Sequence, residues 1–236
     1  METPVHAPYR ERVRIEIKKI RGMSFKEKRE YIWEYYKIPI IATVICLVLL
    51  GSFINARFIN PRPDAALYVM WNAGFVTDEQ LSDFSEVLKT EIVDENVNEN
   101  IVITTMFTFE EDPTIGMANI QRLAAMLAAG EIDVFLPNTQ ILESYAEHGY
   151  IMSLEGILAE IRVGNPAVYN RIMENAVYGS LGMVDGTFEE RLIGIDIIES
   201  PMIKRFNFFT QELYFAVAVT ARKTENAALA LTALFE

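Results

Sequence analysis

The pattern of hydrophobic and polar positions divides the chain into a charged N-terminal arm, one long apolar run and a region of short alternating elements. The apolar run covers residues 38–56 and contains no charged residue between Lys37 and Arg57. At about 1.5 Å of rise per residue, a helix of this length just crosses the hydrocarbon core of a membrane. The pattern therefore predicts one transmembrane helix over residues 38–56, through which the chain contacts the lipid bilayer.

The arm before this run carries the start signal of a helix. Ser24 and Glu27 have the spacing of a capping box, in which both side chains bind free N–H groups at a helix start. We expect the helix to continue through Trp33 and its neighbouring tyrosines into the apolar run, and Pro39 to bend it there. A basic cluster precedes the run and either only sets the topology or also binds anionic headgroups. Its members are Lys18, Lys19, Arg21, Lys26, Lys28 and Arg29.

From residue 64 onward, short apolar runs alternate with amphipathic segments. The runs at 65–71, 101–109 and 132–136 are rich in apolar, β-branched or aromatic residues, as is typical of buried strands. The segments between and after them have helix start signals at Thr77, at Asp112-Pro113 and at Asn138 or Thr139, and Gly130 is expected to end the second. This order predicts an α/β fold with a mainly parallel sheet flanked by helices.

The second half of this region is less regular. Helices are expected at 154–161, 167–176 and 224–235, and a strand at 213–219. Asp185-Gly186 predicts a hairpin between strands at 178–184 and 187–195. The expected domains are a cytoplasmic basic juxtamembrane helix (1–37), the transmembrane helix (38–56) and an extracytoplasmic α/β domain (57–236).

Charge is distributed unequally around the apolar run. The whole chain has a net charge of −12, but residues 1–37 hold ten Lys/Arg and six Asp/Glu, whereas residues 57–236 hold eleven and twenty-seven. By the positive-inside rule, this asymmetry places the N-terminus in the cytoplasm and the acidic domain outside the cell membrane. The outer domain has no cysteine for a disulfide, which favours a bacterial cell envelope. An acidic excess of this size also argues against a nucleic-acid partner, since phosphate recognition needs clustered basic side chains.

The inventory of reactive side chains argues against an enzyme. The two histidines, His6 and His148, fall on opposite sides of the expected membrane, and the only cysteine, Cys46, lies within the apolar run. A two-histidine metal site and a Cys–His nucleophile pair are therefore not expected in the outer domain. The sequence also has neither a P-loop nor a G-x-G-x-x-G fingerprint. We expect no catalytic residues, no metal and no cofactor.

Two stretches resemble a known family. Residues 123–136 read Leu-Ala-Ala-Met-Leu-Ala-Ala-Gly-Glu-Ile-Asp-Val-Phe-Leu, and residues 145–154 continue with a Tyr-x-x-x-Gly segment before a leucine. They resemble extracellular solute-binding proteins of the type 2 periplasmic-binding fold. The segments 194–201 and 213–219 resemble the family's strand returning to its first lobe. The basic arm also looks like the leader of uncharacterised Firmicutes membrane proteins. The resemblance implies a truncated form: a single lobe with a small hairpin insertion, carried on a membrane anchor.

In a parallel sheet, ligands bind beyond the carboxyl ends of the strands. The residues at the predicted strand ends are Trp71, Asn72, Phe109, Glu110, Asn138 and Thr139. Trp71 is suited to stacking on a ring, and the amides and the hydroxyl are suited to hydrogen-bonding a polar solute. The alternative is core packing for the two aromatic residues and loop or capping duty for the other four.

Two functions follow from this reading. The first is a membrane-anchored, solute-binding-like receptor or accessory subunit for a small polar solute, which predicts a polar pocket at the strand ends. The second is an interaction module that binds no solute and docks on a membrane protein complex, which predicts a flat or apolar patch there.

Overall fold

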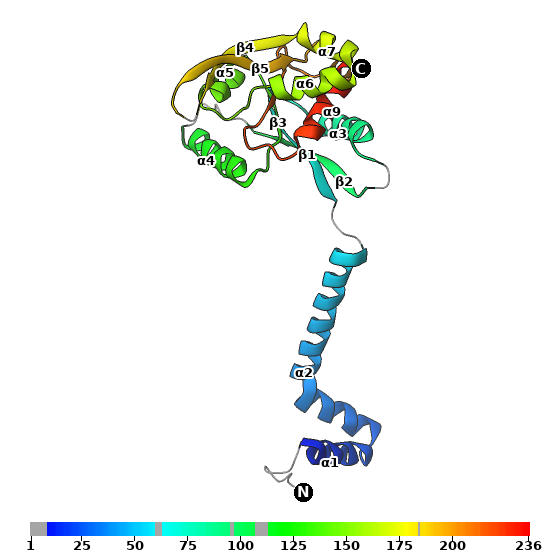
Figure 1. The fold of residues 1–236 in the computed structure, drawn as a ribbon. Helices are drawn as coiled ribbons and strands as arrows, with labels where there is room; N and C mark the ends of the chain where they lie inside the picture. The colour runs from blue at the N-terminus through cyan, green and yellow to red at the C-terminus, as the bar shows by residue number, and fades with distance from the viewer. Residues whose placement is uncertain (1–8, 60–62, 95–96, 107–112, 184) are drawn as a thin grey trace. The chain divides into compact units, whose positions relative to one another are not determined.

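The computed structural model describes residues 9–59, 63–94, 97–106, 113–183 and 185–236. The chain forms two compact units, Met1–Arg62 and Pro63–Glu236. The first contains helices α1 (Tyr9–Arg21) and α2 (Phe25–Ile54), followed by one turn of π-helix, η1 (Asn55–Ile59). The second is an α/β domain (Figure 1). Phe109 and Glu110 lie outside the described residues.

Helix α2 begins at the predicted capping box. The Ser24 N–H donates to the Glu27 carboxylate at 2.8 Å, and the Glu27 N–H donates to the Ser24 hydroxyl at 3.4 Å. The continuous helix Phe25–Phe58 is long and apolar enough to cross a membrane, and none of the residues of α2 is buried within the unit. Pro39 lies inside α2, and Figure 1 shows the helix bent part-way along its length. A proline causes such a bend because it removes one backbone hydrogen bond and crowds the preceding turn.

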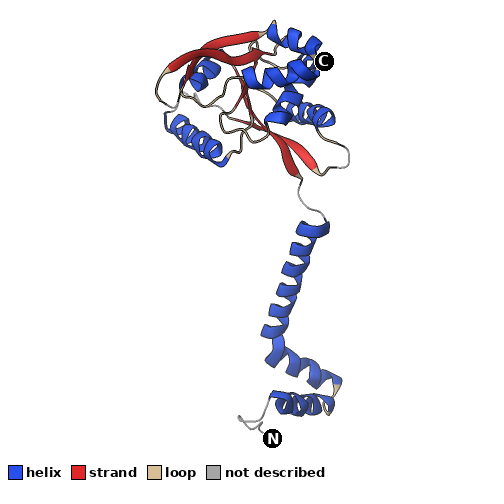
Figure 2. Ribbon diagram, viewed as in Figure 1, coloured by secondary structure: helices blue, strands red, loops and turns tan. Residues whose placement is uncertain are grey.

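The α/β domain is built on one six-stranded sheet in the order β2-β1-β3-β6-β5-β4. Figure 2 draws the strands in red and the helices in blue. The strands are β1 (Asp64–Asn72), β2 (Glu99–Thr105), β3 (Val134–Pro137), β4 (Ala176–Gly182), β5 (Phe188–Asp196) and β6 (Tyr214–Val217). β1 pairs in parallel with both β2 and β3. β6 is antiparallel to β3 and to β5, and β4 is antiparallel to β5.

The prediction of a mainly parallel sheet is therefore wrong, because the sheet is mixed. The hairpin is also not a small insertion, since β5 pairs with β6 and extends the same sheet. The physical reason is connectivity. The tight turn at Asp185-Gly186 forces β4 and β5 to run in opposite directions. β6 then enters between β3 and β5, beside β3 in the antiparallel direction.

Helices cover both faces of the sheet and create two cores. The face that includes Trp71, Val134 and Phe215 packs against one group of helices, and the face that includes Met70, Phe135 and Ala216 packs against another. Alternate residues of each strand point to opposite faces, which explains this division. The first group is α3 (Asp78–Ile92), α6 (Glu155–Gly164), α7 (Pro166–Met173), α8 (Pro201–Phe206) and α9 (Thr224–Phe235). The second is α4 (Pro113–Ala129) and α5 (Thr139–Glu147).

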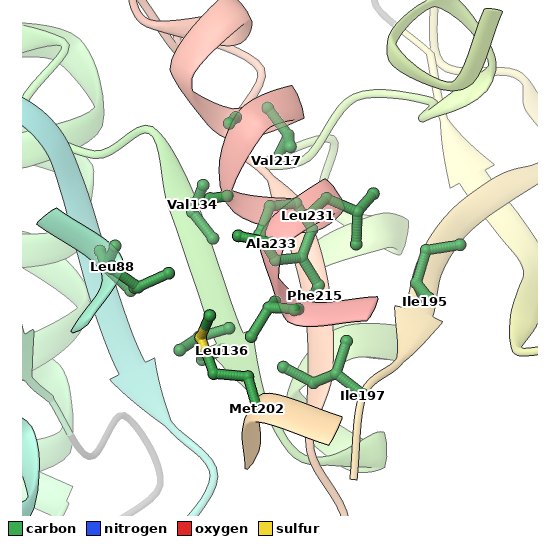
Figure 3. Close-up of a cluster of buried hydrophobic side chains, with 14 of the residues drawn as sticks. Leu88, Val134, Leu136, Ile195, Ile197, Met202, Phe215, Val217, Leu231 and Ala233 are labelled. Atoms are coloured by element: carbon green, nitrogen blue, oxygen red, sulfur yellow. The ribbon is translucent and has the colours of Figure 1, made fainter. Parts of the chain in front are cut away.

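The last helix, α9, occupies the middle of the first core. Seven of its twelve residues are buried, and most of these seven are alanine or leucine. Figure 3 shows Leu231 and Ala233 of α9 close to Phe215 of β6, with Met202 of α8 nearby. Small alanine side chains let the helix approach its many neighbours closely, while the leucines fill the space between them.

Most of the expected elements are present. Thr77 and Gln80 form the second capping box, and Gly130 ends α4 with a φ of 63°, a conformation that favours glycine. β2 ends at Thr105, before the expected limit at 109, and residues 107–109 are outside the described part. Helix α8 has no counterpart among the helices and strands expected from the sequence.

Candidate functional site

The carboxyl ends of the parallel strands meet at one edge of the sheet. In the strand register, Trp71 of β1 is paired with Thr105 of β2, and Asn72 is paired with Pro137 of β3. The Met106 N–H donates to the Trp71 carbonyl at 3.2 Å and joins the ends of β1 and β2. Four of the six predicted site residues lie at this edge in the described structure: Trp71, Asn72, Asn138 and Thr139.

Trp71 is completely buried at the end of β1. Its ring lies 4.7 Å from that of Phe208, and its indole N–H donates to the Gly74 carbonyl at 2.9 Å. Phe208 in turn contacts Phe84 of α3, with ring centroids 5.7 Å apart. Aromatic pairs with this spacing and a satisfied indole N–H are typical of a core. In this conformation neither face of the indole is open to a solute.

Asn72 is also buried, with 1% of its surface exposed. Its side-chain amide donates to the Met106 carbonyl and so ties β1 to the segment after β2. Its Oδ1 has no hydrogen-bond partner among the described residues. An unpaired buried acceptor costs about 1–3 kcal/mol, so this oxygen is a reason to look for a donor at the strand ends.

Asn138 and Thr139 start helix α5 directly after β3. The Asn138 Oδ1 accepts the Ile141 N–H at 3.0 Å, which is the ordinary geometry of an N-cap. The Thr139 hydroxyl donates to the exposed Glu212 carboxylate at 2.7 Å, and the Thr139 N–H also donates to it at 3.2 Å. The Tyr214 hydroxyl lies 3.1 Å from the Thr139 hydroxyl. A carboxylate is favourable at this position, because a helix N-terminus carries a partial positive charge.

The loop between α8 and β6 closes over the other side of the same edge. Its Thr210 hydroxyl donates to the Ala73 carbonyl at 2.9 Å and links the loop to the segment after β1. Two large apolar side chains on the two linked loops remain exposed, Phe75 at 67% and Phe209 at 71%. Sequence reasoning missed both, although Phe209 follows Phe206 and Phe208, which pack inward. The sequence signal was the close spacing of Phe206, Phe208 and Phe209, since three rings within four positions cannot all face the core.

Exposed carboxylates follow each of these two phenylalanines within four positions of the sequence. Asp78 and Glu79 begin α3 shortly after Phe75, and Glu212 follows Phe209. The edge therefore combines exposed aromatic rings with negative charge. An exposed apolar centre with a charged rim is the usual composition of a protein-binding surface.

Of the hollows on the domain, one adjoins this edge through Thr139 and another lies elsewhere. The first, of about 250 Å³, is lined by apolar side chains such as Leu142, Val177 and Ile193 as well as by Thr139, Glu143, Ser180 and Tyr214. The second, of about 510 Å³, lies at the end of the β4–β5 hairpin beside the last turn of α5. Its lining is mostly apolar and includes Leu181, Met183 and Phe188. Neither hollow includes Trp71 or Asn72.

Arg191 of β5 also contributes to the larger hollow, but it is already paired. Its guanidinium contacts the Glu189 carboxylate at 2.6 Å and the Glu155 carboxylate at 3.3 Å. The hydrogen bond and charge of Glu189, together with the charge of Glu155, raise the pKa of Arg191 above its ordinary value. All three side chains are exposed, so water screens these pairs and their stabilising effect is small. Within the described residues, no group of three His, Cys, Asp or Glu side chains could hold a metal ion.

Asp133, in the Asp-Val-Phe stretch that carries the family resemblance, is 99% buried. One carboxylate oxygen accepts the Tyr68 N–H at 3.0 Å. The other accepts the Arg222 and Lys223 N–H groups at 2.8 and 3.0 Å. The carboxylate therefore joins β1, the start of β3 and the segment before α9, and its accepting positions are used by backbone donors. This is a structural role at the edge opposite to the strand ends.

Comparison with known proteins finds a distant structural likeness. No family model matches the chain, and no curated protein matches it. A solved structure, the extracellular solute-binding protein family 1 from Alicyclobacillus acidocaldarius subsp. acidocaldarius DSM 446, is similar at 17% sequence identity with a TM-score of 0.30. The match covers 58% of this chain, which spans 29% of the length of that protein. A likeness at this level does not assign an activity to this chain.

Proposed function

We propose that this protein is a single-pass membrane protein whose α/β domain is an extracytoplasmic interaction module. The domain docks on a membrane protein complex through the carboxyl-end edge of β1 and β3, and its role is binding rather than catalysis. The observation that carries this proposal is the pair of exposed phenylalanines, Phe75 and Phe209, on the two loops joined by the Thr210–Ala73 hydrogen bond. Aromatic residues dominate the energetic centres of protein interfaces.

The charge around this edge indicates the chemistry of the partner. Three exposed carboxylates lie close to the two phenylalanines in the sequence. Asp78 and Glu79 follow Phe75, and Glu212 follows Phe209. The matching surface is a protein with an apolar pocket bordered by lysine or arginine, since complementary charge accelerates association and selects the partner. The anchor supports the same proposal. Helix α2 exposes its apolar side chains along its whole length, and lipid is the environment that covers such a surface.

Site-specific photo-cross-linking in intact membranes tests the proposal. A photoreactive residue at position 75 or 209 should give one discrete adduct with a membrane protein. The same residue at Val163, which is 87% exposed on α6, is the control and should give none. Charge reversal at Glu212→Lys should weaken the adduct, whereas Glu160→Lys on α6 should not. Equal adducts at all three positions would contradict docking through this edge.

A second candidate is a receptor for a small polar solute, and a separate observation favours it. The unpaired Oδ1 of Asn72 and the N-terminus of α5 lie at neighbouring strand ends, where donors of a solute would find an acceptor. A thermal-shift screen of the intact protein against sugars, amino acids, peptides and polyamines separates the two candidates. A ligand at about a hundred times its dissociation constant adds roughly 2.7 kcal/mol to the free energy of unfolding. A saturable shift in melting temperature that is lost in the Thr139→Val variant but retained in the Thr187→Val variant would favour the receptor.

A further inference from the structure

The N-terminal unit has an amphipathic surface next to the expected transmembrane segment. Phe25, Ile32 and Trp33 recur at helical spacing along one side of α2, and they are 86%, 37% and 67% exposed. Lys28 and Arg29 belong to the same side. These side chains, together with Glu30, border a shallow hollow of about 630 Å³ whose walls are mostly apolar. We call Phe25, Lys28, Arg29, Ile32 and Trp33 the juxtamembrane stripe.

The bend of α2 determines whether the juxtamembrane stripe can contact the membrane surface. Phe25 precedes the apolar run by thirteen residues, which is about 20 Å along a straight helix. A straight helix perpendicular to the bilayer would therefore carry Phe25 well away from the lipid. Pro39 lies at the start of the run, and the helix is bent (Figure 1). A bend at this position turns the segment before it toward the plane of the membrane.

Basic side chains extend the stripe into α1. Residues 18–36 contain six Lys or Arg and three carboxylates; all six basic residues precede Glu30 and Glu34, and Glu27 is held in the capping box by Ser24. Lys18, Lys19 and Arg21, in the last turn of α1, are exposed. The Lys19 ammonium lies 3.3 Å from the Tyr31 hydroxyl and 4.8 Å from the centre of its ring, which joins the end of α1 to α2.

We propose that residues 18–36 lie along the cytoplasmic surface of the membrane and bind anionic phospholipid headgroups. The basic side chains contact the headgroups, while Phe25 and Trp33 enter the boundary of the acyl chains, where aromatic rings are favoured. The bilayer is the partner within reach, because the same helix enters the apolar run five residues after Trp33. The inference rests on the proposed anchoring of the chain with its N-terminus in the cytoplasm.

Fluorescence quenching by brominated lipids in nanodiscs tests this placement with the full-length chain. The probe is Phe25→Trp in a Trp33→Phe background, and Trp33→Phe alone measures the contribution of the buried Trp71. Discs of phosphatidylcholine, with and without phosphatidylglycerol, are compared with and without bromine on the acyl chains. We expect quenching of the tryptophan at position 25 in discs that contain phosphatidylglycerol. It should be weaker in phosphatidylcholine alone and at high salt, because screening weakens the headgroup attraction.

Two variants separate charge from geometry. Lys28→Gln with Arg29→Gln should reduce the quenching, whereas the matched pair Lys204→Gln and Arg205→Gln in the α/β domain should leave it unchanged. Pro39→Ala should reduce it by straightening α2. A tryptophan at position 25 that is unquenched in every lipid would overturn the placement, and quenching independent of lipid charge would overturn the headgroup binding. A chain that does not enter the discs at all would instead refute the anchoring itself.

Discussion

At the scale of single residues, the carboxylate of Asp133 holds distant segments of the α/β domain together. It is buried and accepts three backbone hydrogen bonds, from Tyr68, Arg222 and Lys223. Hydrogen bonds to a charged acceptor each contribute about 1.5–3 kcal/mol. The two oxygens thus connect segments that are 65 and 90 positions apart in the sequence.

We expect Asp133→Asn to lower the free energy of unfolding by about 2–4 kcal/mol. The amide has no charge, and its NH2 group replaces one accepting oxygen, so that two donors face each other. Chemical denaturation of the protein measures this change. Glu131→Gln, two residues earlier and exposed, is the control and should change stability by less than about 0.5 kcal/mol. Equal effects of the two substitutions would mean that Asp133 does not hold these segments together.

At the scale of elements, the close approach of β4 to α5 depends on a glycine. A Cβ at Gly182 would collide with the Glu147 backbone carbonyl, whereas a Cβ at Gly156 in α6 would meet nothing within 4 Å. We expect Gly182→Ala to destabilise the protein by about 1–3 kcal/mol, because backbone atoms have to move. Gly156→Ala should stabilise it by about 0.5–1 kcal/mol, since alanine is the better helix former. Melting temperatures of the two variants should therefore move in opposite directions.

The hairpin turn between β4 and β5 is expected to respond to acid. The Thr187 hydroxyl donates to the Asp185 carboxylate at 2.6 Å and the Thr187 N–H donates to it at 3.0 Å. These bonds lower the pKa of Asp185 below its ordinary value of 3.8. The stabilisation is therefore complete above pH 3.8 and is lost as the pH falls through the lower pKa of the folded state. Carboxyl NMR titration should find this lowered pKa, and Thr187→Val should return it toward the ordinary value.

At the scale of the whole molecule, the charge asymmetry predicts one orientation in the membrane. In a Cys46→Ser background, Thr187→Cys in the exposed hairpin should react with a membrane-impermeant thiol reagent added to intact cells. Lys26→Cys should react only after the membrane is opened, because the positive arm stays in the cytoplasm. Labelling of position 26 in intact cells would reverse the proposed topology. Both variants should remain in the membrane fraction after alkaline extraction.

The local elements of this protein could be predicted from its sequence. The capping boxes at Ser24 and Thr77, the stop at Gly130 and the turn at Asp185-Gly186 depend on residues within a few positions of one another, so their signals can be read in order along the chain. The apolar run is equally local, since length and absence of charge are enough to define it.

The pairing of these elements, and the exposure of particular side chains, could not be predicted in the same way because they depend on contacts between distant segments. The antiparallel placement of β6 beside β3 made the sheet mixed, and it joins segments about 80 residues apart. Trp71 is buried because Phe208, 137 positions later, packs against its ring, while Phe75 and Phe209 stay exposed. Thr139 is held by Glu212 through a contact of the same kind. Such long-range contacts depend on the order of strands in the sheet, which the hydrophobic pattern of a single strand or helix does not encode.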